Sequence, residues 1–558
     1  MVSPNVASSI DTIRAASGIP IRLDGDTLTL GGEAVGLPTK LTGEKGTLFG
    51  IDGLFPTVPR ADDRDKLLWS VVAEAKAKPD QKVSLLSDQD LAMALPRLLN
   101  LGEEASQATA DALMDRFFNR KNADARVLLP VHSSLPLNYK HVRSTGRSSG
   151  FRMFNGGILP FLLWQSSENN VDTELLATLF EAVSDDTELT ALDRHFLDVA
   201  LKDATDREAK ADATELVRRY AQQFHDELDR PGAVFCQPSM DLFRRDLATV
   251  LSTDLPRPDK ILWLTLLLSL HLTVRLYRIA VIKGNELDIA VAAAGQLPAP
   301  PGVAGCACAP TVESQDCLLS CPMAGMLRFR TSSGRYRPVR DNDGCRTSYV
   351  KVDERRLLDM PATLVTRTLG SHAWAALGGG EAARRGDLLE MARALNADRD
   401  LRRHHDALCR AIAVLHHDQW RGGASTTGEL EDVTRIGPGL HALREDVRKM
   451  RSRDLRHQSR DIDNQLVLDQ NVGGQGSLVS RNGTRSFYEL DEQLLLLLVR
   501  LTCQDAQIPY DEFLSRLSAY GLAPQDNRET DSLADALERL GLLVRFSDSG
   551  EASFVHYN

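Results

Sequence analysis

Four cysteines that lie close together are the first candidates for chemistry in this chain. Cys306, Cys308, Cys317 and Cys321 fall within 16 residues, and Cys345 follows. Clustered thiolates are common ligands of structural zinc, which takes four ligands in a tetrahedron, so one zinc ion bound by the first four residues is a testable prediction. Their spacing departs from the usual Cys-x2-Cys pairs, however, and free or partly buried thiols are the preferred interpretation.

Directly after the cysteines, arginine alternates with apolar or aromatic residues across a Ser-Ser-Gly turn. No acidic residue occurs at 318–340, although the whole chain carries a net charge of −11. The alternation predicts a basic β-hairpin over 327–340, whose arginines would grip phosphates while an aromatic ring stacks on bases. A solvated strand face is the alternative. The predicted nucleic-acid contacts are Arg328, Arg330, Arg335, Arg337 and Arg340.

Two further tracts are basic. Residues 125–166 contain no Asp or Glu, and their Ser- and Gly-rich centre suits anion binding. Lys140, Arg143 and Arg147 are therefore predicted as a second nucleic-acid contact, with an ordinary surface loop as the alternative.

Residues 444–460 carry seven Arg or Lys against three acids on an expected helix, for which a salt-bridged solvent face is the preferred interpretation.

Two patterns indicate an enzyme instead. The His-His-Asp triplets at 404–406 and 416–418 resemble the metal-binding pairs of phosphohydrolases, and Glu286 with Asp288 resembles the acidic, Mg²⁺-holding strand of restriction-type nucleases. Neither set is complete, because the remaining metal ligands and the Glu-x-Lys strand cannot be assigned. The sequence also lacks a Walker A loop, a nucleophile elbow and a dinucleotide fingerprint. A metal-dependent nuclease or phosphohydrolase is therefore the alternative to a non-catalytic protein.

The elements that must position these residues follow from composition and periodicity. The 558 residues are 42% hydrophobic and 26% charged, which is ordinary for a globular protein of several domains. Helical periodicity dominates, and an alternating stretch at 21–30 predicts a hairpin, so we expect a mainly α multidomain protein with small β elements. The apolar run at 261–274 is too short to span a membrane, and no secretion signal is present. We expect a cytoplasmic protein with a buried helix at 261–274.

Prolines at 297–302 and glycines at 473–477 interrupt regular structure and divide the chain. The expected units are a β-hairpin with helices at 1–123, a helical bundle at 124–296, the Cys-rich insert with its basic hairpin at 297–350, a helical domain at 351–470, and a last domain at 485–558.

The last domain has the clearest pattern. Three expected helices precede two expected strands, which is the order of a winged helix-turn-helix. Such a module usually reads DNA through its third helix. Residues 485–558, however, carry six Arg, no Lys and 13 Asp or Glu, a net charge of −7. Protein docking is therefore expected rather than DNA reading. The helices are expected at 491–503, 510–520 and 531–540, and the strands at 542–546 and 552–557.

The segments 473–477, 494–499 and 542–551 together resemble the winged-helix ends of non-ATPase accessory proteins in bacterial phage-defence systems, including systems linked to DNA modification. The resemblance covers less than a fifth of the chain. It implies a partner that is an ATPase or nuclease subunit, and a role in sensing or positioning DNA. We therefore expect a non-catalytic adaptor that docks other protein subunits through the acidic winged helix and contacts DNA through the basic residues.

Overall fold

A computed structural model of the chain is mainly helical, with several small sheets. This confirms the mainly α class that the sequence predicts. The structure describes residues 2–37, 68, 93–113, 162–165, 168, 170–185, 188–201, 236–298, 315–331, 359–420, 427–449, 479–482, 485–546 and 553–557.

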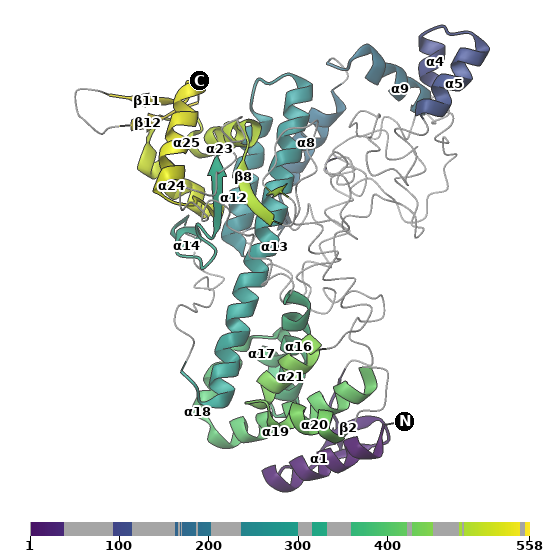
Figure 1. The fold of residues 1–558 in the computed structure, drawn as a ribbon, viewed down its shortest axis with the longest axis vertical. Helices are drawn as coiled ribbons and strands as arrows, with labels where there is room; N and C mark the ends of the chain where they lie inside the picture. Colours follow the sequence, from purple (N-terminus) through teal and green to yellow (C-terminus); the bar gives the residue numbers. More distant parts are fainter. Residues whose placement is uncertain are drawn as a thin grey trace, which may run out of the picture.

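One long helix, α13 (Arg257–Gly295), runs through the centre of the molecule (Figure 1). Its 39 residues correspond to a length of about 58 Å. The helix has a proline in its first turn and is capped at its C-terminus by Gln296, whose φ of 53° is left-handed. Of the described helices, α13 alone is long and apolar enough to cross a membrane, and its apolar window is wholly buried. It is therefore packed here as the core helix that the sequence predicts.

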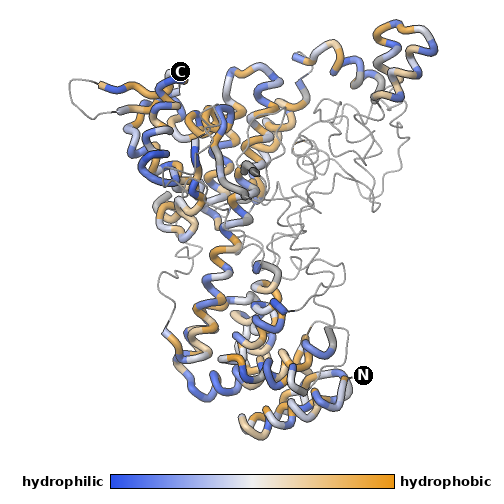
Figure 2. The backbone as a smooth tube through the Cα atoms, in the orientation of Figure 1, coloured by the Kyte–Doolittle hydropathy of each residue, from blue (hydrophilic) through white to orange (hydrophobic). Residues whose placement is uncertain are grey.

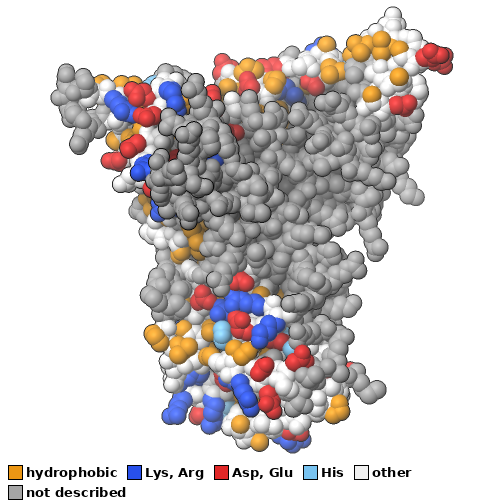
Figure 3. Space-filling view, viewed as in Figure 1, with side chains coloured by type: hydrophobic (Ala, Val, Ile, Leu, Met, Phe, Trp, Pro, Cys, Tyr) orange, Lys and Arg blue, Asp and Glu red, His pale blue; other side chains and the backbone are white. Residues whose placement is uncertain are grey.

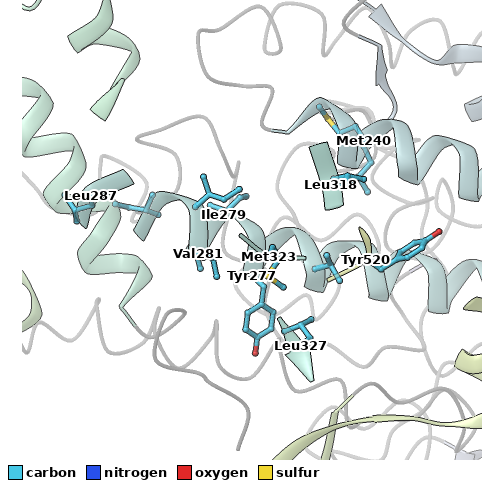
Figure 4. Close-up of a cluster of buried hydrophobic side chains, with 14 of the residues drawn as sticks. Met240, Tyr277, Ile279, Val281, Leu287, Leu318, Met323, Leu327 and Tyr520 are labelled. Carbon is cyan, nitrogen blue, oxygen red and sulfur yellow. The ribbon is translucent and has the colours of Figure 1, made fainter. Parts of the chain in front are cut away.

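Helices from distant parts of the sequence pack around the first half of α13. Helix α12 (Gln237–Leu251) contacts α8 (Thr173–Ser184), α13 and α23 (Glu492–Cys503). Figure 4 shows apolar side chains buried in this region, among them Met240 of α12 and Tyr277 of α13. Figure 2 likewise shows hydrophobic residues gathered around the upper end of α13. One apolar core therefore joins the middle of the sequence to its C-terminal part.

The second half of α13 packs against another group of helices. Helices α16 (Met360–Ala376), α18 (Leu388–Ala397) and α21 (Gly439–Lys449) contact α13, and α19 (Arg399–Trp420) contacts α21 and α1 (Pro4–Ser17). The N-terminal helix is therefore held by helices from the second half of the chain, at the lower end of the molecule in Figure 1.

Several short elements lie outside the helices described above. The predicted hairpin at 21–30 is confirmed, because β1 (Ile21–Asp24) pairs antiparallel with β2 (Thr27–Leu30). Gly25 in the turn has a φ of 61°, which glycine adopts without steric cost. The other short elements are β3 (Glu33–Ala34), α4 (Ala94–Leu98), α5 (Glu103–Leu113), β4 (Trp164–Gln165), β5 (Asn170–Val171), α9 (Ala191–Leu201), α14 (Gln315–Leu319), α17 (Gly380–Arg385) and α20 (Thr427–Arg435).

The C-terminal part contains the three predicted helices and the two predicted strands. Helix α23 is followed by α24 (Tyr510–Ala519) and α25 (Asn527–Arg539). Strand β11 (Leu543–Arg545) pairs antiparallel with β12 (Ser553–Val555), and β12 pairs with β9 (Ile508–Pro509), which the sequence did not reveal. The strand order β11-β12-β9 leaves β11 at an edge of this sheet.

A second C-terminal sheet corrects the predicted basic hairpin. Strand β6 (Leu327–Thr331) lies between β10 (Leu522–Pro524) and β8 (Arg485–Leu490), parallel to both, and β8 pairs antiparallel with β7 (Val479–Asn482). The basic strand therefore exists, but its hydrogen-bonding partners are C-terminal strands rather than a return strand from the same hairpin. Neighbours occupy both edges of β6, so no edge remains for such a return strand. The other half of the expected hairpin lies outside the described residues.

Two further expectations are corrected. The acidic strand expected around Glu286 and Asp288 is part of helix α13, because the surrounding Leu- and Ala-rich sequence favours a helix. Helix α25 begins four residues earlier than expected, at Asn527. The Asp526 side chain accepts a hydrogen bond from the Glu529 N–H and caps the helix there.

Candidate protein-docking surface

Within the described residues, no strand pairs with the outer edge of β11. The His556 N–H donates to the Leu542 carbonyl at 3.0 Å, and Leu543 lies opposite Val555. Because inward and outward groups alternate along an antiparallel strand, the main-chain groups of Leu543 and Arg545 point away from β12. No hydrogen bond to these outward groups occurs within the described part of the chain. A strand edge of this kind is a template for β-strand addition.

The face of β11 that points away from the helices is apolar. Val544 and Phe546 share this face, because side chains two residues apart lie on the same side of a strand. Their side chains are 39% and 50% exposed, which is high for large apolar residues. Phe554 of β12 lies opposite Val544, and its ring makes an edge-to-face contact with Phe546 at 5.7 Å. These three residues form a small apolar surface, which we call the wing face.

The other face of β11 meets acidic side chains of α25. Arg545 reaches back to the Asp535 carboxylate at 2.9 Å and to Glu538 at 3.3 Å. Both carboxylates are more than half exposed, and Asp531 on the same helix is exposed as well. One arginine thus forms ion pairs with two acidic side chains beside the strand edge. The edge of β11 therefore separates an apolar surface from an acidic one.

Two of the predicted nucleic-acid contacts lie on one face of β6. Arg328 is exposed, and its guanidinium donates to the Pro524 carbonyl at 3.4 Å. Arg330, two residues later on the same face, is half-buried. The structure thus brings these two arginines together on a strand of the C-terminal sheet. The remaining predicted contacts lie outside the described residues: Lys140, Arg143, Arg147, Arg335, Arg337 and Arg340.

The described part of the third basic tract is salt-bridged. Arg444 pairs with Asp288 of α13, and Arg448 pairs with Asp359 at 2.8 Å and Glu445 at 2.6 Å. In Figure 3, basic and acidic side chains accordingly lie side by side over the lower helices. The helical part of the tract, up to the end of α21, therefore fits the preferred interpretation of a salt-bridged face.

The predicted zinc ligands are only partly visible in the structure. Cys306 and Cys308 lie outside the described residues. Cys317 is buried and takes part in a disulfide bond, whereas Cys321 is a half-buried free thiol. Within the described ranges no three His, Cys, Asp or Glu side chains are grouped as ligands for a metal ion. A disulfide sulfur supplies no thiolate, so zinc binding here requires Cys317 to be reduced. Zinc binding stays a prediction.

Three of the four histidines in the two His-His-Asp triplets, His405, His416 and His417, are buried and hydrogen-bonded. His405 contacts the Gly370 carbonyl through Nε2 at 3.1 Å. His416 and His417 both use Nδ1 to contact Asp446 of α21, His416 at 3.0 Å. Burial lowers the pKa of His405 and of His416, which favours the neutral imidazoles. The two triplets therefore use different partners in the structure and do not share a site.

The aspartates of these triplets also have structural partners. Asp406 accepts hydrogen bonds from the Gly439 N–H and from Arg410, and Asp418 accepts one from the Ser3 N–H at 3.0 Å. Each aspartate thus joins α19 to another segment of the chain.

The acids considered for a nuclease also have basic partners. Glu286 is buried and pairs with Lys283 at 2.7 Å, and Asp288 pairs with Arg444. Both lie on α13 within one turn of each other, and each belongs to a separate ion pair. The geometry therefore favours a structural role for these two carboxylates.

A buried polar cluster went unnoticed in the sequence. Asp246 of α12 is fully buried and accepts hydrogen bonds from Tyr520 at 2.8 Å and from Arg245 at 3.2 Å, and it lies 2.9 Å from His271 Nε2. Tyr520 follows α24, so this cluster joins α12 and α13 to the C-terminal part. The signal in the sequence that could have revealed this cluster is an acidic residue, Asp246, on the apolar side of α12 between Phe243 and Leu247.

No family model matches the chain, and a comparison with curated proteins gives no match.

Proposed function

We propose that the chain is a non-catalytic adaptor that captures a partner protein by strand addition at the edge of β11. The observation that carries this proposal is the open edge of β11 between the apolar wing face and the acidic side of α25. Main-chain hydrogen bonds would supply affinity there, and side chains alternating between the two surfaces would supply specificity.

The chemistry of the two surfaces defines the partner. An added strand places alternate side chains on opposite faces. Residues on one face would meet Val544 and Phe546, and residues on the other would meet Asp535 and Glu538. The partner segment is therefore extended, with apolar residues alternating with Lys or Arg. The net charge of −7 for residues 485–558 favours such a basic segment.

We also propose that residues 485–558 are a winged helix, of which β11 and β12 form the wing. The element order supports this: helix α23, strand β9, helices α24 and α25, then the β11–β12 hairpin, with β9 joined to β12. In this assignment α25 is the helix that would read DNA in a DNA-binding relative. Its exposed acids disfavour phosphate contact, which supports the docking of protein.

The resemblance of the C-terminal segments to phage-defence accessory proteins suggests that the partner is an ATPase or nuclease subunit in the cytoplasm of a bacterium. Under this proposal any DNA contact lies elsewhere, on the face of β6 that carries Arg328 and Arg330. The exposure of Arg328 is what supports it.

The test uses the whole chain, because β6 and β7 lie outside residues 485–558 and complete the C-terminal sheet. A fluorescent peptide of alternating Lys and Val serves as the probe, and a peptide with the same composition in two blocks serves as its control. We expect the alternating peptide to bind more tightly. The variant Arg545→Pro removes an outward N–H donor, and Arg545→Ala removes the same side chain but keeps the donor. Binding should weaken at least about tenfold more in the proline variant.

Charge reversal tests the acidic surface. The double variant Asp535→Lys with Glu538→Lys should weaken binding of the alternating peptide, whereas Asp505→Lys, at a residue that is 89% exposed, should not. Equal binding by the two Arg545 variants would overturn strand addition. If the unmodified chain retards duplex DNA in a gel and the double variant changes that retardation, the result would instead favour DNA reading by α25.

A further inference from the structure

A small cavity lies where α12 and α13 meet the end of α24. It has room for about one water molecule. Its polar lining comes from Ser239 of α12, from His271, Arg275 and Arg278 of α13, and from Tyr520. The described lining is otherwise leucine and valine, and no carboxylate belongs to it. Three basic side chains thus face a small, mostly apolar space.

The two arginines of this cavity are almost completely buried. Arg275 is 3% exposed and Arg278 is 2% exposed, and they lie one helical turn apart on the same side of α13. Burial, together with the nearby charge of Arg278, lowers the pKa of Arg275 to about 10. A guanidinium group as deeply buried as that of Arg278 needs a counter-charge in an apolar setting.

Arg278 has no such counter-charge within the described part of the chain. Its Nη2 donates to the Ala519 carbonyl at 3.0 Å, whereas its buried Nε has no hydrogen-bond partner and none of the described carboxylates forms an ion pair with it. Asp246 is engaged elsewhere, since Tyr520, His271 and Arg245 contact its two oxygens. A buried cation with an unsatisfied donor at a cavity is the arrangement that an anion would complete.

We propose that this cavity binds a small inorganic anion of about the size of chloride. The anion would accept the Nε–H of Arg278 and would neutralise part of the buried charge of that arginine. The volume of the cavity restricts the ligand to a single small ion. Because Arg278 also holds the Ala519 carbonyl, the bound anion would fix the end of α24 on α13. This site is independent of the strand edge at β11.

The experiment compares thermal unfolding of the whole chain in sodium chloride and in sodium gluconate at equal ionic strength. Gluconate is too large for the cavity, and general screening is the same in both salts. Chloride at roughly 100 times its dissociation constant should raise the melting temperature of the whole chain by about 2 °C. The variant Arg278→Met should reduce this difference to less than about 0.5 °C, because it removes the binding charge. Arg367→Met, which removes another buried arginine far from the cavity, should keep the difference.

A second measurement needs only the unmodified protein. Chloride NMR lines should broaden on addition of the protein, and bromide should compete for the site. Equal melting temperatures in the two salts, or a chloride effect that survives in Arg278→Met, would overturn the proposal. A larger effect of phosphate than of chloride would also overturn it, since the cavity would then accept a larger ion.

Discussion

The hydroxyl of Tyr520 donates a hydrogen bond of 2.8 Å to the Asp246 carboxylate, which joins the end of α24 to α12. Both residues are buried, and His271 contacts the same carboxylate oxygen at 2.9 Å. The residues are 274 positions apart in sequence. The C-terminal helices are therefore attached to the central helices by a buried polar cluster as well as by the apolar core.

Removal of this hydroxyl should destabilise the protein. Tyr520→Phe leaves the ring in place but takes one donor from a buried carboxylate, which should lower the free energy of unfolding by about 1–3 kcal/mol. Urea denaturation of the whole chain measures this change. Tyr557→Phe is the matched control, because the Tyr557 ring contacts Trp263 and Arg500 but its hydroxyl has no described hydrogen bond. The control should change the free energy of unfolding by less than about 0.5 kcal/mol. Equal losses in the two variants would contradict the role of the hydrogen bond.

The contact between α19 and α21 depends on a glycine. A Cβ at Gly439 would lie 2.1 Å from the Asp406 carbonyl oxygen, which is main chain and cannot rotate away. We expect Gly439→Ala to lower the free energy of unfolding by more than about 2 kcal/mol. Gly428→Ala in α20 is the control, because nothing lies within 4 Å of its Cβ position, and it should stabilise the helix by about 0.5–1 kcal/mol. A tolerated Gly439→Ala would mean that the two helices lie further apart.

Stability should decrease in mild acid because of the buried histidines. Burial lowers the pKa of His405 and His416 in the folded protein, so below about pH 6.5 the unfolded chain binds protons on these residues more readily. Proton binding to the unfolded chain favours unfolding, so the free energy of unfolding should fall from pH 7 to pH 5. His405→Gln should make this fall shallower than it is in the unmodified protein, measured by urea denaturation at each pH. A fall of equal size in the variant and in the unmodified protein would assign the effect to other groups.

Asp446 should extend the same trend to lower pH. Burial acts to raise the pKa of its carboxyl, but hydrogen bonds from His416 and His417 outweigh burial and lower that pKa. Its stabilising contribution is therefore complete above about pH 4 and is lost as the pH falls further. Asp446→Asn should remove this part of the acid sensitivity, measured as the midpoint of acid unfolding.

Any nucleic-acid binding by the whole chain should depend on the face of β6. Replacing Arg328 and Arg330 by glutamine should reduce the slope of log affinity against log salt by up to about two, because each phosphate contact releases condensed counter-ions. Gel retardation at several salt concentrations measures the slope. Arg539→Gln, on the acidic α25, is the control and should leave the slope unchanged. An unchanged slope in the β6 variant would place the contact outside this strand.

Local sequence patterns predicted those parts of the fold that local interactions determine. The hairpin around Gly25 follows from a turn that glycine favours, and the buried helix at 261–274 follows from its apolar run. The order of α23, α24, α25, β11 and β12 was also predictable, because each element has its own periodicity and end signals. Its assignment to a winged helix stays a prediction.

The remaining features depend on partners far away in sequence. Alternating arginines predicted the strand at Arg328, but they carried no information on its pairing with Pro524 and Tyr488. The acidic stretch at Glu286 alternates like a strand, yet the helix around it determines its conformation. Charge counting predicted an acidic docking module, but the open edge of β11 became visible only from the strand order.

The position of β6 also affects how the chain can be synthesised. Translation proceeds at roughly 5–20 residues per second, so β6 leaves the ribosome on the order of ten seconds before β8 exists to pair with it. During that interval both edges of an Arg- and Phe-containing strand remain exposed, which makes the nascent chain a natural client for chaperones. Synthesis that stops before β8 would leave this strand permanently unpaired, so truncated products should aggregate rather than accumulate as soluble fragments.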